Sequence, residues 1–147
     1  MQEVWLVGET EDFLAAVLPR QVAAGTAVHN GESAPWVSLW SQSDPVTLFG
    51  ARLSRSGAAD VQAFNEHLGD WFRDCSSYEI KLVAAGASGD LGYTVAYEKT
   101  VASVRGGPAE PYTLRVTHVY RRERGEWRVV HRHGDAAPEG DREVAEA

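Results

Sequence analysis

Apolar residues recur at helical spacing in the first half of the chain. Between residues 9 and 30 they lie about one turn apart, and Thr10 can cap this segment at its start. Pro19 lies inside the segment, so we expect it to kink the helix or split it in two. The same spacing predicts a short second helix over residues 33–40 and a third over residues 58–72.

From residue 76 onward the period of the pattern changes to two. Tyr78, Ile80 and Leu82 alternate with Glu79 and Lys81, as expected for a strand with one buried face. Strands are predicted from residue 76 to a turn at 88–90, and then over residues 91–104, 112–123 and 127–133, with a short earlier one at 46–49.

Helices followed by long antiparallel strands predict an α+β fold. We expect the helices to pack on the concave face of a curved antiparallel sheet, which would leave a cone-shaped pocket between them. We assign residues 1–135 to a single domain and residues 136–147 to a polar C-terminal tail.

Charge and composition narrow the classes of partner. The 147 residues are 44% hydrophobic and 24% charged, with a net charge of -7, which is the composition of a globular domain. An acidic surface argues against nucleic acid and against anionic membranes. No apolar run is long enough to span a membrane, and the run at residues 4–7 is too short for a signal peptide, so we expect a cytoplasmic protein. The one cysteine, Cys75, cannot form an internal disulfide or a cysteine-paired zinc site.

The last hairpin permits a prediction of register. If Arg124-Gly125 is a two-residue loop, Glu123 pairs with Glu126 and Tyr120 faces Val129. Continuing the same register places His118 opposite His131 and Val116 opposite His133. The apolar alternation points one face into the cone, and this face carries Leu114, Val116, His118 and Tyr120.

The pocket is then predicted to hold a Tyr–His–His cluster formed by Tyr97, His118 and His131. On the preceding strand we place Leu91, Tyr93, Val95 and Tyr97 on the inward face. Other predicted pocket residues are Tyr93, Trp40, Tyr120, Val95 and Phe49. Neutral imidazoles in apolar surroundings suit acid–base chemistry near pH 7, although a buried histidine is more often a hydrogen-bonded core residue.

The remaining polar residues are assigned to surfaces. His29 and His67 lie on helices without an evident partner, so we expect both at the surface. The outer face of the sheet is expected to carry a salt-bridged set made of Arg115, Arg121, Arg128 and Arg132 with Glu79 and Glu98. A three-histidine metal site from His118, His131 and His133 would lack carboxylates around it, so no metal is expected.

The hairpin over residues 114–133 and the strand start at residues 89–95 resemble those of SnoaL-like proteins, in the nuclear transport factor two-like or ketosteroid-isomerase-like superfamily. The superfamily also has similar residues where the first helix ends, here Asn30-Gly31-Glu32, and just before the third helix, here Arg55-Ser56-Gly57. The resemblance covers roughly residues 10–134. It implies the cone-shaped, cystatin-like fold and a homodimer formed through the convex face of the sheet.

The catalytic residues of the best-known relatives do not carry over. The ketosteroid isomerase positions fall near Ala24, Leu48 and Thr117, and none has a Tyr or Asp within one residue. The Asp–Arg–Asp set of limonene-epoxide hydrolases is also absent from the predicted pocket strands. The resemblance therefore argues against steroid isomerisation.

Two functions remain open. The first is a cofactor-free isomerase, cyclase or dehydratase acting on an apolar, polyketide-like small molecule. His118 would be its acid or base, with Tyr97 or His131 as partner. The second is a non-catalytic domain that binds a ligand or oligomerises, as in kinase hub domains.

Overall fold

The computed structural model describes the backbone of residues 2–141 and the side chains of residues 8–141, so the predicted tail lies outside the described residues from 142 on. The first half contains α1 (Gln2–Val28), α2 (Ala34–Val37), β1 (Thr47–Gly50), β2 (Ser54–Ser56), α3 (Ala58–Glu66) and the short 3₁₀ helix η1 (Leu68–Trp71). The second half contains β3 (Phe72–Ser88), β4 (Leu91–Val104), β5 (Ala109–Glu123) and β6 (Glu126–Ala136).

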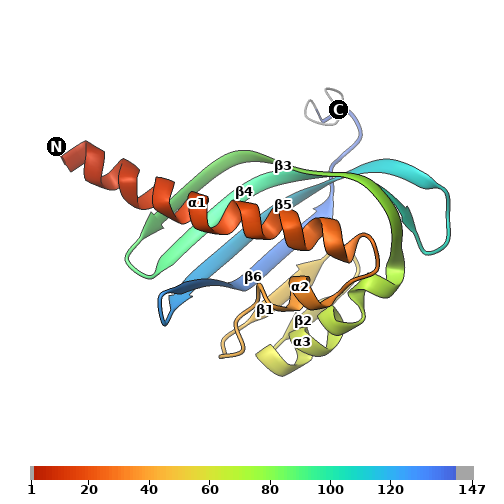
Figure 1. The fold of residues 1–147 in the computed structure, drawn as a ribbon, viewed down its shortest axis with the longest axis horizontal. Helices are drawn as coiled ribbons and strands as arrows, with labels where there is room; N and C mark the ends of the chain where they lie inside the picture. Colours follow the sequence, from red (N-terminus) through yellow and green to blue (C-terminus); the bar gives the residue numbers. More distant parts are fainter. Residues whose placement is uncertain (1, 142–147) are drawn as a thin grey trace.

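The strands form one curved sheet in the order β2-β1-β6-β5-β4-β3. Helix α1 lies across the concave side of this sheet (Figure 1). Helix α2 contacts α1 and α3, and α3 contacts β1 and β2. The predicted α+β fold is confirmed. The sheet is mixed, because β1 runs parallel to β6 while the long strands are antiparallel to one another.

Helix α1 continues through Pro19 without being split. Its buried stripe, spaced at whole turns, is formed by Phe13, Val17, Ala24 and Val28. Gly25 permits close approach to β3, since a Cβ atom there would lie 2.2 Å from Cε2 of the Tyr78 ring. The absence of a side chain at Gly25 therefore sets the distance between the helix and the sheet.

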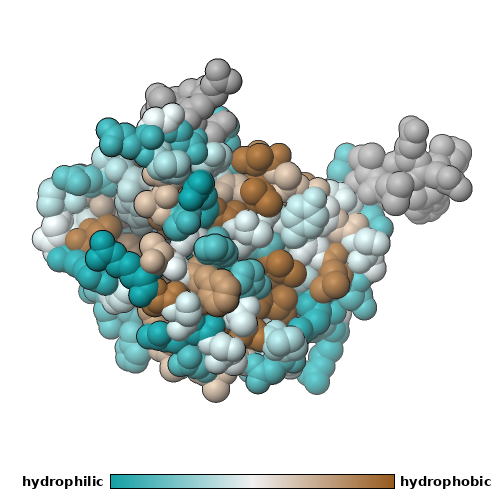
Figure 2. Space-filling view, turned by 180° about the vertical axis from the view of Figure 1, so that it is seen from behind, coloured by the Kyte–Doolittle hydropathy of each residue, from teal (hydrophilic) through white to brown (hydrophobic). Residues whose placement is uncertain are grey.

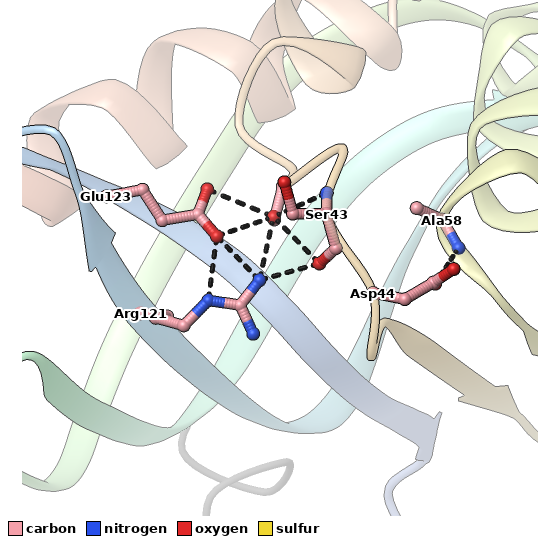
Figure 3. Close-up of polar contacts among 6 residues, drawn as sticks. Ser43, Asp44, Ala58, Arg121 and Glu123 are labelled. Atoms are coloured by element: carbon pink, nitrogen blue, oxygen red, sulfur yellow. Dashed lines mark hydrogen bonds and ion pairs between the residues drawn. The ribbon is translucent and has the colours of Figure 1, made fainter.

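The segment between α2 and β1 is anchored to the sheet and to α3 (Figure 3). Ser41 donates a hydrogen bond of 2.8 Å to Glu123, and Arg121 donates one of 2.6 Å to the Ser43 carbonyl. Asp44 accepts a 2.6 Å hydrogen bond from the Ala58 backbone N–H, which satisfies a donor at the start of α3. These bonds fix α3 where it can form one wall of a pocket.

The β5–β6 hairpin begins in the predicted register and then departs from it. Arg124 and Gly125 both have positive φ, 53° and 80°, as a two-residue hairpin turn requires. The pairs Glu123–Glu126 and Tyr120–Val129 form as predicted.

Val130 is then an extra residue on β6, which shifts every later pair by one position. His118 faces Arg132 instead of His131, and Val116 faces Gly134 instead of His133. Both predicted pairings are therefore wrong. A β-bulge reverses the faces that follow it, so Arg132 points to the concave side and the two later histidines to the outer side.

The predicted inward face of β4 is also wrong. Tyr93 is 44% exposed, and Val95 and Tyr97 lie along a hollow of the outer face. Thr94, and not Tyr97, pairs with His118. The inward residues of β4 are small or polar: Gly92, Thr94, Ala96, Glu98, Thr100 and Ala102. A Cβ atom at Gly92 would lie 2.7 Å from the Phe13 ring, so this face is small because α1 packs closely on it.

Candidate functional site

A pocket of about 360 Å³ lies on the concave side of the sheet, between α1, α3 and strands β1, β4, β5 and β6. Its apolar lining comes from helices as well as strands and includes Val28, Trp36, Leu48, Phe64, Leu68, Trp71, Phe72 and Leu114. A volume of this size suits a small organic ligand.

The charged centre of the pocket is an ion pair between Glu98 of β4 and Arg132 of β6. Arg132 donates two hydrogen bonds to the Glu98 carboxylate, at 2.7 and 3.1 Å. The two side chains are only 2% and 12% exposed. Burial alone would raise the pKa of Glu98, but the facing Arg132 guanidinium outweighs it and holds that pKa below its ordinary value. Glu98 and Arg132 are thus both charged in the folded protein.

A closed ring of hydrogen bonds supports this ion pair from behind. Arg132 donates to Nε2 of His118 at 3.1 Å, so the His118 proton is on Nδ1, which lies 3.4 Å from the Tyr120 hydroxyl. Tyr120 donates to the Gln21 side-chain oxygen at 3.0 Å, and Gln21 donates to Glu98 at 3.0 Å. The ring orients both charged groups through buried partners.

His118 belongs to this ring and is not among the residues that line the pocket. It is 1% exposed, and burial together with the Arg132 charge lowers its pKa to about 3. Both of its ring nitrogens are already engaged. A direct acid–base role for His118 stays a prediction, and its position favours a supporting role.

A second polar pair, His29 and Tyr112, lies in the pocket wall. The structure buries His29, which is 6% exposed, so the prediction of a surface position was wrong. Its Nδ1 lies 2.6 Å from the Gly25 carbonyl oxygen and its Nε2 lies 2.9 Å from the Tyr112 hydroxyl. Because the carbonyl can only accept, Nδ1 carries the proton and Nε2 accepts the hydrogen of Tyr112.

Burial shifts both groups toward their neutral forms. It lowers the pKa of His29 and raises the pKa of Tyr112 to about 12. At neutral pH Tyr112 is therefore a hydrogen-bond donor to the free Nε2 of a neutral imidazole. Sequence reasoning missed this pair, although Tyr112 shares the inward parity of Leu114 and His29 lies one turn after Gly25.

The other predicted site residues are dispersed. Phe49 lines the pocket as predicted, and its ring also lies 5.4 Å from the His131 ring. His131 is outside the pocket, 2.7 Å from the Thr47 hydroxyl. Trp40 is buried in the core and is not part of the lining.

The predicted outer-face salt bridges form for three of the arginines: Arg115 with Asp135, Arg121 with Glu123, and Arg128 with Glu126. The assignment of Arg132 and Glu98 to that face was wrong, because the two form the ion pair on the concave side.

The described part of the chain lacks both a metal-binding cluster and a membrane-spanning helix. No cluster of three or more His, Cys, Asp or Glu side chains suited to a metal ion occurs among its residues. None of its helices has the length and apolar character needed to cross a membrane.

The fold has many solved counterparts of low sequence identity. A protein from Streptomyces avermitilis described as a dehydratase of the NTF2-like family aligns with a TM-score of 0.71 and 18% identity, over 87% of this chain and 98% of that one. A Thiobacillus denitrificans protein described as a calcium/calmodulin-dependent protein kinase type II association domain gives 0.68 and 20%, over 84% and 96%. A ketosteroid isomerase-like protein from Erwinia carotovora atroseptica gives 0.65 and 18%, over 85% and 97%.

Sequence comparison identifies the family. No curated protein matches the chain. The profile of the SnoaL-like domain matches residues 22–137, which include every strand from β1 to β6 and all of the pocket lining. The chain therefore belongs to the SnoaL-like domain family.

Proposed function

We propose that this protein binds a small, largely apolar molecule in the concave pocket and catalyses proton transfer on it without a cofactor. The observation that carries the proposal is the Tyr112–His29 pair in an otherwise apolar wall, beside the Glu98–Arg132 ion pair. Apolar pockets with a few convergent polar groups are the usual form of a ligand site.

The Tyr112–His29 pair can both accept a proton from the ligand and return one to it. A proton leaving the ligand would pass to the Tyr112 oxygen while the Tyr112 proton passes to Nε2 of His29, and the reverse movement would return a proton at another ligand atom. The net result is isomerisation, or loss of water if a hydroxyl leaves. The Arg132 guanidinium would stabilise negative charge developing on a ligand oxygen.

Asn65 of α3 offers a further contact. It is 1% exposed and lines the pocket, and its side-chain nitrogen has no hydrogen-bond partner among the described residues. Buried donors are nearly always paired. A ligand oxygen could therefore accept from Asn65, which supports a substrate with at least one carbonyl or hydroxyl group.

Filling the pocket should abolish ligand binding. Leu114→Trp places a large ring where Leu114 lines the cavity, so we expect the freshly purified wild type, and not this variant, to carry a non-covalent adduct in native mass spectra. Denaturing spectra of both samples identify covalent changes. Leu91→Trp is the matched control, because Leu91 is 58% exposed and outside the lining. Equal adducts in all three proteins would contradict the proposal.

A second candidate function is assembly through the outer face of the sheet. Figure 2 shows apolar side chains on this face with polar ones between them. Val83 and Tyr93 are 59% and 44% exposed, and Val83 lines the outer hollow together with Val95 and Tyr97. We propose that a second copy of the chain covers this face, because exposed apolar side chains of this size favour burial.

Val83→Asp tests this assembly. The exposed position tolerates the change in a monomer, whereas a buried charge at an interface is costly. Light scattering after size-exclusion chromatography should show a dimer for the wild type and a monomer for Val83→Asp. The control is Val22→Asp on α1. Val22 is 39% exposed in the wild type and is not on the outer face of the sheet, so this change should leave the dimer intact. A monomeric wild type, or a dimeric Val83→Asp variant, argues against this interface.

A further inference from the structure

We infer that the ligand is a monocarboxylate whose anionic group lies at the mouth of the pocket, between Arg52 and Arg105. This inference rests on the proposed function, because it names the chemical class of the molecule that enters the pocket. The apolar body of the ligand would occupy the cavity, and its carboxylate would remain near solvent.

The charges of the lining residues indicate an anion. The lining includes two acidic residues, and both are neutralised: Glu98 by Arg132 inside the pocket, and Asp135 by Arg115 on the outer face, at 3.1 and 3.3 Å. Arg52 and Arg105 also line the pocket and are exposed, yet neither forms an ion pair with any described residue. On a chain with a net charge of -7, two uncompensated arginines in the lining of one pocket create a local site of the opposite sign.

Arg105 is held in place before any ligand arrives. It follows β4 in a tight turn with a φ of 53°, and its backbone N–H donates a 2.7 Å hydrogen bond to the Trp71 carbonyl. Its guanidinium carbon lies 4.4 Å from the centre of the Trp71 ring, which is part of the apolar wall. Stacking restrains the side chain and leaves the edge of the guanidinium free to bind both oxygens of a carboxylate.

Arg52 is a second exposed arginine of the pocket lining. It lies in the loop between β1 and β2, next to Leu53 and close in sequence to Phe49, and all three line the cavity. The inner end offers no net charge, because Glu98 and Arg132 cancel each other. A molecule with one terminal carboxylate and an apolar body matches this distribution better than a neutral molecule or a dianion.

Matched acids and amides test the inference directly. Binding of octanoate and naphthoate is compared with that of octanamide and naphthamide by quenching of tryptophan fluorescence, since Trp36 and Trp71 line the pocket. We expect at least one acid to bind about tenfold more tightly than its amide, as one charged hydrogen-bonded contact provides. The difference should shrink as salt is added.

Arg105→Gln and Arg52→Gln should each weaken binding of the acid by about tenfold and leave binding of the amide unchanged. The control is Arg124→Gln, because Arg124 occupies the same left-handed position, with a φ of 53°, in the turn at the other end of β5. It is outside the lining, so both affinities should match those of the wild type.

The outcomes separate this inference from the proposed function. Equal binding of acid and amide, or acid binding that neither arginine variant weakens, overturns the carboxylate inference while leaving the pocket as a ligand site. Absence of binding by all four probes overturns the inference as well. If the Leu114→Trp variant in addition carries the same adduct as the wild type, the proposed function fails with it.

Discussion

Replacing Arg132 by Met is expected to lower the free energy of unfolding by about 3–5 kcal/mol. The substitution leaves the buried Glu98 carboxylate without a counter-charge and removes two of its hydrogen bonds. It also leaves Nε2 of His118 without its donor. Urea denaturation at pH 7, followed by tryptophan fluorescence, measures the change.

A double variant distinguishes loss of the pair from loss of packing. Glu98→Leu combined with Arg132→Met removes both charges, and we expect it to recover most of the stability lost by Arg132→Met alone, since an apolar pair avoids the cost of burying ions. A loss below about 1 kcal/mol in Arg132→Met alone would show that water replaces the Arg132 guanidinium as the partner of Glu98. The double variant should also lose binding of any ligand that uses Arg132.

The ion pair has a pH window of its own. Arg132 holds the pKa of Glu98 below its ordinary value, so the stabilisation is complete above the pKa of an unfolded glutamate. It is lost as the pH falls through the lower pKa of the folded protein. This loss therefore lies below the ordinary pKa of glutamate and leaves the range above that pKa to the histidines.

The fold was accessible from sequence because its strands and turns follow simple periodicities. The strand at residues 91–104 and the Arg124-Gly125 turn lie where the alternation predicts them. The parallel pairing of β1 with β6 was not accessible, because four residues of β1 carry no signal about the strand they join. The short strand β2 was missed for the same reason.

The site was less accessible, and two local features explain why. The bulge at Val130 exchanges the faces of β6, and nothing in the alternation of residues 127–133 marks it. On β4 the larger apolar residues, such as Tyr93, point outward, because the close approach of α1 admits only small residues inside. A rule that turns the most apolar face inward therefore selected the wrong face and concealed Glu98.

The same two features determine the chemistry of the pocket. The bulge brings Arg132 to the concave side, and the small inward face of β4 leaves room for Glu98 beneath α1. His118 then becomes the neutral acceptor that orients Arg132, and Tyr112 and His29 form the neutral hydrogen-bonded pair in the cavity wall. The function we propose therefore depends on residues that sequence reasoning assigned to surfaces or did not select.

The free energy of unfolding is expected to fall as the pH is lowered from about 6.5, the ordinary histidine pKa. Burial and the Arg132 charge lower the pKa of His118 to about 3 in the folded protein. Between these two values the unfolded chain binds a proton at this position that the folded protein does not, so acid favours unfolding. His118 alone should account for about 2–3 kcal/mol between pH 6.5 and 4.5. His29, whose pKa burial also lowers, acts in the same direction.

His118→Gln separates this contribution from the rest of the acid response. A glutamine oxygen can still accept from Arg132 but does not titrate, so the slope of unfolding free energy against pH should decrease by close to one proton, whatever the absolute stability of the variant. His67→Gln is the control, because the His67 side chain is 81% exposed and lies outside the hydrogen-bonded ring around Glu98 and Arg132. Urea denaturation at several pH values between 4.5 and 7.5 gives all three slopes. An unchanged slope in His118→Gln would contradict the prediction. It would mean that the folded protein also binds a second proton on the His118 ring, at the Nε2 atom that accepts a hydrogen bond from Arg132.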